Sequence, residues 1–175
     1  MVNIVQIADK KQGAVLRQKA ELVDINDIEN GKIKTIIGDM VSALEKQDDG
    51  IAIAAPQIGV SLQIFVVSGR VLKLADETYK GDESNLVFIN PKITKYSKEK
   101  QEVEEGCLSV RWKYGKIKRA DKVTLEAINE KGEKINRGAS GLLAQVFQHE
   151  TDHLHGILFT DTAYDVKEIP PEGDN

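Results

Sequence analysis

Hydrophobic residues recur every three or four positions between residues 31 and 47, the spacing of one face of an α helix. They are Ile33, Ile36, Ile37, Met40, Val41 and Leu44. A second helix is predicted to begin near Ser140, a residue type that often caps a helix, and to end before Gly156. Leu142 and Val146 share one face of it, while Phe147 points elsewhere, so this helix should be buried on more than one side.

Short runs of β-branched and aromatic residues predict strands at 62–67, at 86–89 and at 157–159, the second ended by Asn90 and Pro91. Segments 123–128 and 133–135 flank a turn at 129–132 and predict a hairpin, and the polar stretch 76–84 predicts a loop. The strands are grouped rather than alternating with helices. The expected fold class is therefore α+β, with mostly antiparallel β-sheets packed around the second, central helix.

A chain of 175 residues fits one domain. We expect that domain over 1–165 and a flexible tail over 166–175, where the sequence is polar and contains prolines. A net charge of -4 gives no reason to expect a nucleic-acid partner. Cys107 is the only cysteine, which favours a reducing compartment. With neither a secretory leader nor an apolar run of ~18 residues, a cytoplasmic protein that does not insert into membranes is expected.

The segment 148–154, QHETDHL, contains the pattern H-E-x-x-H within the second predicted helix. Residues four apart lie above one another on a helix, so His149 and His153 can present two imidazoles to one metal ion. Glu150 then stands beside them as a candidate base for a water molecule. Because the surrounding positions are apolar, both imidazoles should be partly buried and need a partner. The pattern favours a metal-dependent hydrolase.

The third metal ligand is less evident from the residues alone. His155 is too close to His153 on the same helix, and Glu168 and Glu172 lie in the expected tail. Cys107 remains, although a lone cysteine is more often a small buried hydrophobic residue. Its surroundings, EEGCLS, are unusual for a core cysteine because two acids and a glycine precede it.

Three segments together resemble the motifs of the peptide deformylases, in the order found in that family. They are GIAIAAPQ at 50–57, EGCLS at 105–109 and QHETDH at 148–153. The resemblance extends over most of the chain, including Leu16 and Arg17, residues 88–91 and residues 158–161. Three motifs in this order are far more specific than any one of them.

The resemblance implies a role for each matching residue. Cys107, His149 and His153 would hold the metal, and Glu150 would transfer protons. Gln57 and the backbone N–H of Leu108 would stabilise the oxyanion that forms when water attacks the formyl carbon. One donor of this kind typically lowers the activation barrier by ~3 kcal/mol. Glu105 would pair with Arg119 and hold the cysteine loop. The substrate would be bound by Gly50, Ile51, Ala52, Val103, Glu105, Gly106, Leu142 and Val146, although the apolar members among them suit plain core packing equally well.

The implied cofactor is one divalent metal ion, iron(II) as the physiological ion, with zinc(II), nickel(II) or cobalt(II) able to occupy the site. The implied substrate is a nascent polypeptide that starts with N-formylmethionine, which would yield formate. Transient ribosome association is expected for this activity, and a monomer is the default state.

Two positions depart from the family pattern. Ala52 stands where a second glycine is usual, and Arg111 stands where a proline commonly follows Ser-Val. The added methyl group of Ala52 should narrow the peptide groove. Two other functions stay open: an H-E-x-x-H endopeptidase with a different third ligand, and a related protein that binds peptides without turnover.

Overall fold

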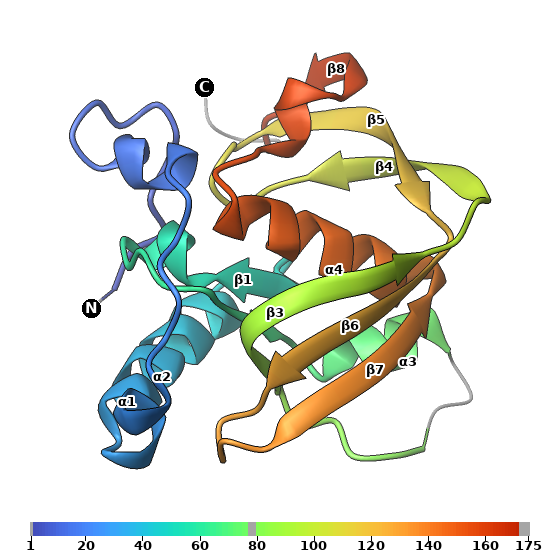
Figure 1. The fold of residues 1–175 in the computed structure, drawn as a ribbon. Coiled ribbons are helices and arrows are strands. Elements are labelled where there is room, and N and C mark those ends of the chain that lie inside the picture. Colours follow the sequence, from blue (N-terminus) through green and yellow to red (C-terminus); the bar gives the residue numbers. More distant parts are fainter. Residues whose placement is uncertain (1, 77–79, 172–175) are drawn as a thin grey trace.

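Two antiparallel sheets and a central helix make up the computed structural model, which describes residues 2–76 and 80–171 (Figure 1). The larger sheet has the strand order β1-β2-β3-β6-β7 and the smaller β4-β5-β8. The strands are β1 (Ala52–Ala54), β2 (Ile64–Val67), β3 (Leu86–Tyr96), β4 (Lys100–Gly106), β5 (Lys113–Ala120), β6 (Lys122–Ile128), β7 (Lys134–Ser140) and β8 (Tyr164–Glu168). The predicted α+β class with mostly antiparallel sheets is confirmed.

Both predicted helices are confirmed, as α2 (Lys32–Glu45) and α4 (Gly141–Leu154). Gly156 follows α4 with φ of 73°, the left-handed conformation typical of a residue that ends a helix. Two short helices, α1 (Ile25–Glu29) and α3 (Arg70–Ala75), and three 3₁₀ helices, η1 (Gly13–Arg17), η2 (Ala55–Ile58) and η3 (Phe159–Asp161), had no clear signal in the sequence pattern.

The larger sheet is covered on both faces, which explains why β2 is buried at every position. Phe65 and Val67 point towards α4, whereas Ile64 and Val66 point towards α2. Adjacent residues of a strand face opposite sides, so an unbroken apolar run is what a strand between two layers requires. Phe147 of α4 packs in this core with its ring centroid 6.0 Å from that of Phe65.

Helix α4 lies between the two sheets (Figure 1). Its apolar residues pack on the larger sheet, and it also contacts β5 of the smaller one. Strand β4 pairs with β5 along its whole length, from Lys100 opposite Ala120 to Gly106 opposite Tyr114. This pairing brings the end of β4, and with it Cys107, beside the helix.

Several details differ from the sequence prediction. Strand β3 does not end before Asn90 and Pro91 but continues to Tyr96, because Asn90 adopts φ of 50° and the pairing with β6 shifts register just beyond it. A proline is tolerated at such an irregularity because no ladder hydrogen bond is needed from it. The strand expected at 157–159 is also wrong: η3 begins at Phe159, and the Leu158 N–H donates to the Asp161 carboxylate.

The predicted tail, 166–175, begins inside strand β8. Residues 166–168, expected in the tail, pair with β5 as part of β8, with Lys113 opposite Glu168. The rest of the predicted tail includes 172–175, and the predicted loop at 76–84 includes 77–79; both stretches lie outside the described residues. The hairpin of β6 and β7 is confirmed, since Asn129 N–H donates to Glu133 C=O at 2.9 Å. Over the described part of the chain, every helix is too short or too polar to cross a membrane.

Candidate metal centre and pocket

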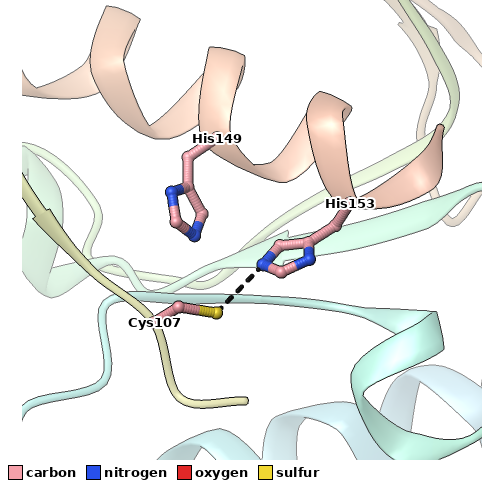
Figure 2. Close-up of side chains that lie close together, drawn as sticks. All are labelled: Cys107, His149 and His153. Atoms are coloured by element: carbon pink, nitrogen blue, oxygen red, sulfur yellow. Dashed lines mark hydrogen bonds between the residues drawn. The ribbon is translucent and has the colours of Figure 1, made fainter. Parts of the chain in front are cut away.

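Three potential metal ligands from two distant segments converge beside α4. Cys107 follows β4, while His149 and His153 stand one turn apart on α4, and their ligand atoms all lie within 4.8 Å of one another. The Cys107 sulfur is 3.2 Å from Nε2 of His153. Figure 2 shows both rings on the side of the helix that faces the cysteine. The structure therefore brings together the three side chains that the sequence motifs singled out.

The His149 ring is held from behind by a buried ion-pair network. Its Nδ1 lies 2.9 Å from Oε2 of Glu105. Arg119 donates to both oxygens of that carboxylate, at 2.8 and 2.9 Å, and its third nitrogen donates to Asp152 at 2.6 Å. The side chains of Glu105 and Arg119 are only 3% and 10% exposed, so this pair is no ordinary surface ion pair. It joins β4 and β5 to α4 and leaves Nε2 of His149 turned towards Cys107 (Figure 2).

The charges of this cluster favour an ionised sulfur. Burial raises the pKa of the Cys107 thiol, but the neighbouring imidazoles of His153 and His149 outweigh it and bring the pKa to about 5. Burial also opposes the charged form of His149, yet its hydrogen bonds with Cys107 and Glu105 raise its pKa well above the usual value. Thiolate is the form of cysteine that binds metals. When a metal cation shared by the three ligands is replaced by protons, the positive charge sits on the imidazoles beside the thiolate.

Glu150 stands beside this centre in a different environment. It is 4% exposed, and burial raises the pKa of its carboxyl group to about 7, against the opposing effect of His149 and His153. One of its oxygens is buried and has no hydrogen-bond partner among the described residues. A buried carboxylate oxygen without a partner needs one inside the site, which fits a water molecule or a reacting group.

Two residues that line the same pocket, Gln57 and Leu108, carry hydrogen-bond donors. The side-chain oxygen of Gln57, in η2, accepts a hydrogen bond from the Ala54 N–H at 2.8 Å, which turns its amide nitrogen towards Ser109 Oγ at 3.2 Å and Cys107 Sγ at 3.6 Å. The backbone N–H of Leu108 donates to no acceptor within the described chain. An oriented amide and a free N–H beside a thiolate can together stabilise a developing oxyanion.

A pocket of about 300 Å³ opens onto this centre. Nearly all of the expected substrate-binding residues line it, namely Gly50, Ile51, Ala52, Glu105, Gly106, Leu142 and Val146. Val103 does not line the pocket; it pairs with Ile117 within the β4–β5 ladder. The sequence analysis included it as an apolar residue of a segment near the motifs, but only the end of β4, from Glu104 onward, reaches the pocket.

Other residues of the pocket were missed by the sequence analysis. Asp49, Arg111, Trp112, Tyr114 and Gln145 all line it. Tyr114 explains why residue 106 is a glycine, because a Cβ on Gly106 would lie 2.7 Å from the Tyr114 ring. The motif alone did not supply this explanation. Arg111 could have been singled out as a pocket residue from the sequence, because it stands where the family pattern commonly has a proline. No sequence signal distinguished the others from ordinary surface positions.

The donor set fits a catalytic metal ion. One thiolate and two imidazoles are soft and borderline ligands that suit a transition-metal dication, and three protein ligands leave a coordination position for water or substrate. Together with an adjacent buried carboxylate and an open pocket, this arrangement defines a metal-dependent hydrolase.

Comparison with known proteins identifies which family of such hydrolases is involved. The family model for polypeptide deformylase matches residues 1–168. Peptide deformylase 2 of Clostridium acetobutylicum is 46% identical over 147 residues, which are 84% of this chain and 87% of the relative. The peptide deformylase of Fusobacterium nucleatum is 42% identical over 156 residues, 87% of this chain and 80% of the relative. The chain belongs to the peptide deformylase family, as its motifs suggested.

Solved structures agree with this assignment. The peptide deformylase of Thermotoga maritima superimposes with a TM-score of 0.77 at 32% identity, covering 94% of this chain and 98% of that one. An actinonin-bound class I type b peptide deformylase from Acinetobacter baumannii gives a TM-score of 0.78 at 27% identity, covering 94% and 99%.

Proposed function

We propose that this chain removes the N-formyl group from polypeptides that begin with N-formylmethionine and releases formate. The observation that carries the proposal is the convergence of the Cys107 thiolate with His149 and His153 beside Glu150 and the pocket. In this proposal the single catalytic domain, expected over 1–165, extends to the end of β8 at Glu168. The protein would be a cytoplasmic monomer that meets nascent chains during transient association with the ribosome, with no direct contact to nucleic acid or membrane.

Cys107, His149 and His153 would hold one divalent ion, with iron(II) as the physiological metal and zinc(II), nickel(II) or cobalt(II) as substitutes. When bound, the ion supplies Lewis-acid activation of water and of the formyl carbonyl. The Glu105–Arg119 pair would keep the His149 ring in its binding orientation and the right tautomer.

Glu150 would take a proton from the attacking water and deliver it to the nitrogen that leaves as the free amine. Its burial and its unpartnered oxygen support this role, because a base must have access to the proton it accepts. The water adds to the formyl carbon, the C–N bond then breaks, and formate and the peptide amine are the two products.

The oxyanion formed on the formyl group would accept hydrogen bonds from the Gln57 amide and the Leu108 N–H. The fixed orientation of Gln57, set by Ala54, supports this role because a donor that is already oriented costs no reorganisation during the reaction. Leu142 and Val146 of α4 and Ile51 and Ala52 near β1 would receive the methionine side chain, an unbranched apolar group.

The experiment that tests the proposal measures formate released from formyl-Met-Ala-Ser by protein prepared without oxygen and loaded with iron(II) or zinc(II). We expect turnover by the wild-type chain. Glu150→Gln should keep its metal and lose turnover by a factor of at least ~100. A chain that binds metal and peptide yet releases no formate would contradict the proposal and favour a binding protein.

Cys107→Ala separates this proposal from an H-E-x-x-H endopeptidase. Metal content should fall far below one ion per chain, because two imidazoles alone hold a dication weakly. The matched control is Ser109→Ala, which changes a neighbouring buried side chain that is not among the three ligands. An endopeptidase with a different third ligand would instead retain its metal in Cys107→Ala.

A further inference from the structure

One side of the pocket is built from a contact between two loops. Arg111, in the loop after Cys107, donates from two guanidinium nitrogens to Asp49, at 2.5 and 3.1 Å, and also to the side-chain oxygen of Gln47 at 2.8 Å. Asp49 and Gln47 lie in the turn between α2 and β1. We call these three residues the rim clamp. A two-nitrogen contact of this kind fixes the plane of the guanidinium as well as its position.

The fixed guanidinium stacks on the next side chain. The Arg111 guanidinium carbon lies 4.6 Å from the centroid of the Trp112 ring. The Trp112 backbone is also held, since its carbonyl accepts a hydrogen bond from Ile169 N–H at 2.8 Å, and Lys113 N–H donates to Val110 C=O at 3.1 Å. Trp112 is therefore restrained both through its backbone and through its ring.

The rim clamp and Trp112 lie at the open end of the pocket. The side chain of Asp49 is 51% exposed, whereas Gln57 and Glu150 at the reacting centre are almost fully buried. A peptide whose formyl group sits at Glu150 and whose methionine side chain occupies the apolar part of the pocket must leave through this end. The residue after methionine then passes the Trp112 ring.

We propose, resting on the function proposed above, that Trp112 selects the residue that follows formylmethionine and favours a large apolar side chain there. The ring offers an apolar face, and Asp49 neutralises the guanidinium behind it, so this wall attracts no acidic group. Glu104 and Lys113, the other charged residues at the exposed part of the pocket, have opposite signs. Arg111 is a positioning residue in this scheme, and Trp112 is the residue that touches the substrate.

The test compares kcat/KM of the metal-loaded full chain for formyl-Met-Phe-Ser and formyl-Met-Gly-Ser. Trp112→Ala should lower kcat/KM about five- to tenfold for the phenylalanine peptide, through KM, and less than about twofold for the glycine peptide. Trp112→Phe should restore most of the preference. Equal losses for both peptides would overturn the inference, because a merely structural role would not distinguish them.

Arg111→Ala should reduce the same preference by releasing the ring, and Arg111→Lys should not restore it, since lysine has no planar fork. The double exchange of Arg111→Asp with Asp49→Arg should recover part of the effect. Arg17→Ala is the matched control: it breaks another exposed arginine–aspartate pair, to Asp161 at 2.6 Å, away from the pocket lining. A change of preference in the control equal to that in Arg111→Ala would count against the clamp.

Trp112 is the only tryptophan of the chain, so it also reports binding directly. In metal-loaded Glu150→Gln protein, formyl-Met-Phe-Ser should shift the tryptophan emission at saturation, and formyl-Met-Gly-Ser should shift it less. An unchanged emission with both peptides, while binding is detected by calorimetry, would overturn the inference even if the Trp112 variants failed to fold. No formate from either peptide with the wild-type chain would instead overturn the proposed function, and this inference with it.

Discussion

The carboxylate of Glu105 lies 2.9 Å from Nδ1 of His149, and both of its oxygens also accept hydrogen bonds from Arg119. Glu105 at the end of β4 thus fixes the imidazole of His149 on α4, although the two residues are 44 positions apart in the sequence. The same strand end carries Cys107. Because Glu105 and Cys107 stand at the same end of β4, the position of the Cys107 thiolate is coupled to the orientation of the His149 ring. A movement of this strand end should change both.

Loss of the Glu105 charge should weaken metal binding without unfolding the site. We expect Glu105→Gln to lower metal affinity by about 10- to 100-fold, because the imidazole loses its orienting acceptor and Arg119 loses its main partner. Competition with a chromophoric chelator measures this. Glu102→Gln is the control, since Glu102 is on the same strand but in an exposed ion pair with Lys116. Equal affinities for the two variants would contradict the prediction.

Glu150 should make the metal-free protein less stable as pH rises. Burial raises its folded-state pKa from 4.5 to about 7, so between these values the folded chain keeps a proton that the unfolded chain has lost. The free energy of unfolding therefore falls with rising pH across this window. Glu150→Gln should be more stable than wild type by up to about 3 kcal/mol near pH 8, and by little near pH 4.

Urea unfolding of the metal-free proteins at several pH values measures this difference. Glu126→Gln, a change of an exposed carboxylate on β6, should show no such trend. A stability gap between Glu150→Gln and wild type that stays constant with pH would show that the gap does not come from the titration of Glu150.

Ala52→Gly should increase activity on formyl-Met-Ala-Ser. Ala52 lines the pocket and is 6% exposed, so its methyl group takes space beside the bound peptide. Removing one methyl group should raise kcat/KM by about tenfold or less. Ala127→Gly, a buried alanine on β6 that does not line the pocket, controls for the general effect of glycine in a strand. An unchanged or lower kcat/KM in Ala52→Gly would refute the idea of a narrowed groove.

Gly156→Ala should destabilise the fold. Gly156 has φ of 73°, and a Cβ there would lie 2.7 Å from the backbone of Arg17, so both strain and a clash with main-chain atoms result. We expect a loss of about 1–3 kcal/mol. Gly138→Ala in β7 is the matched control, because a Cβ there meets nothing within 4 Å. Thermal unfolding that shows similar stability for the two variants would contradict this account.

Much of the fold was readable from local patterns. The apolar spacing of 31–47 predicted α2, and the apolar surroundings of His149 and His153 predicted a buried α4. Strand β4 was not predicted, since its mostly charged and polar residues look like those of any exposed segment. The continuation of β3 past Pro91 was also missed, because it depends on pairing with β6 across a register shift beside Asn90, which is a tertiary feature.

The sequence by itself determined the chemistry: two imidazoles and a carboxylate at helical spacing, and one cysteine with an unusual acidic and glycine-containing context. Helical periodicity is a local property, so this much needs no knowledge of the rest of the chain. The tertiary structure alone decided how the thiolate meets the imidazoles, which residues line the pocket, and that Arg111 is tied to Asp49. These contacts join segments tens of residues apart, and their geometry follows from strand pairing and core packing, which single-residue preferences do not encode.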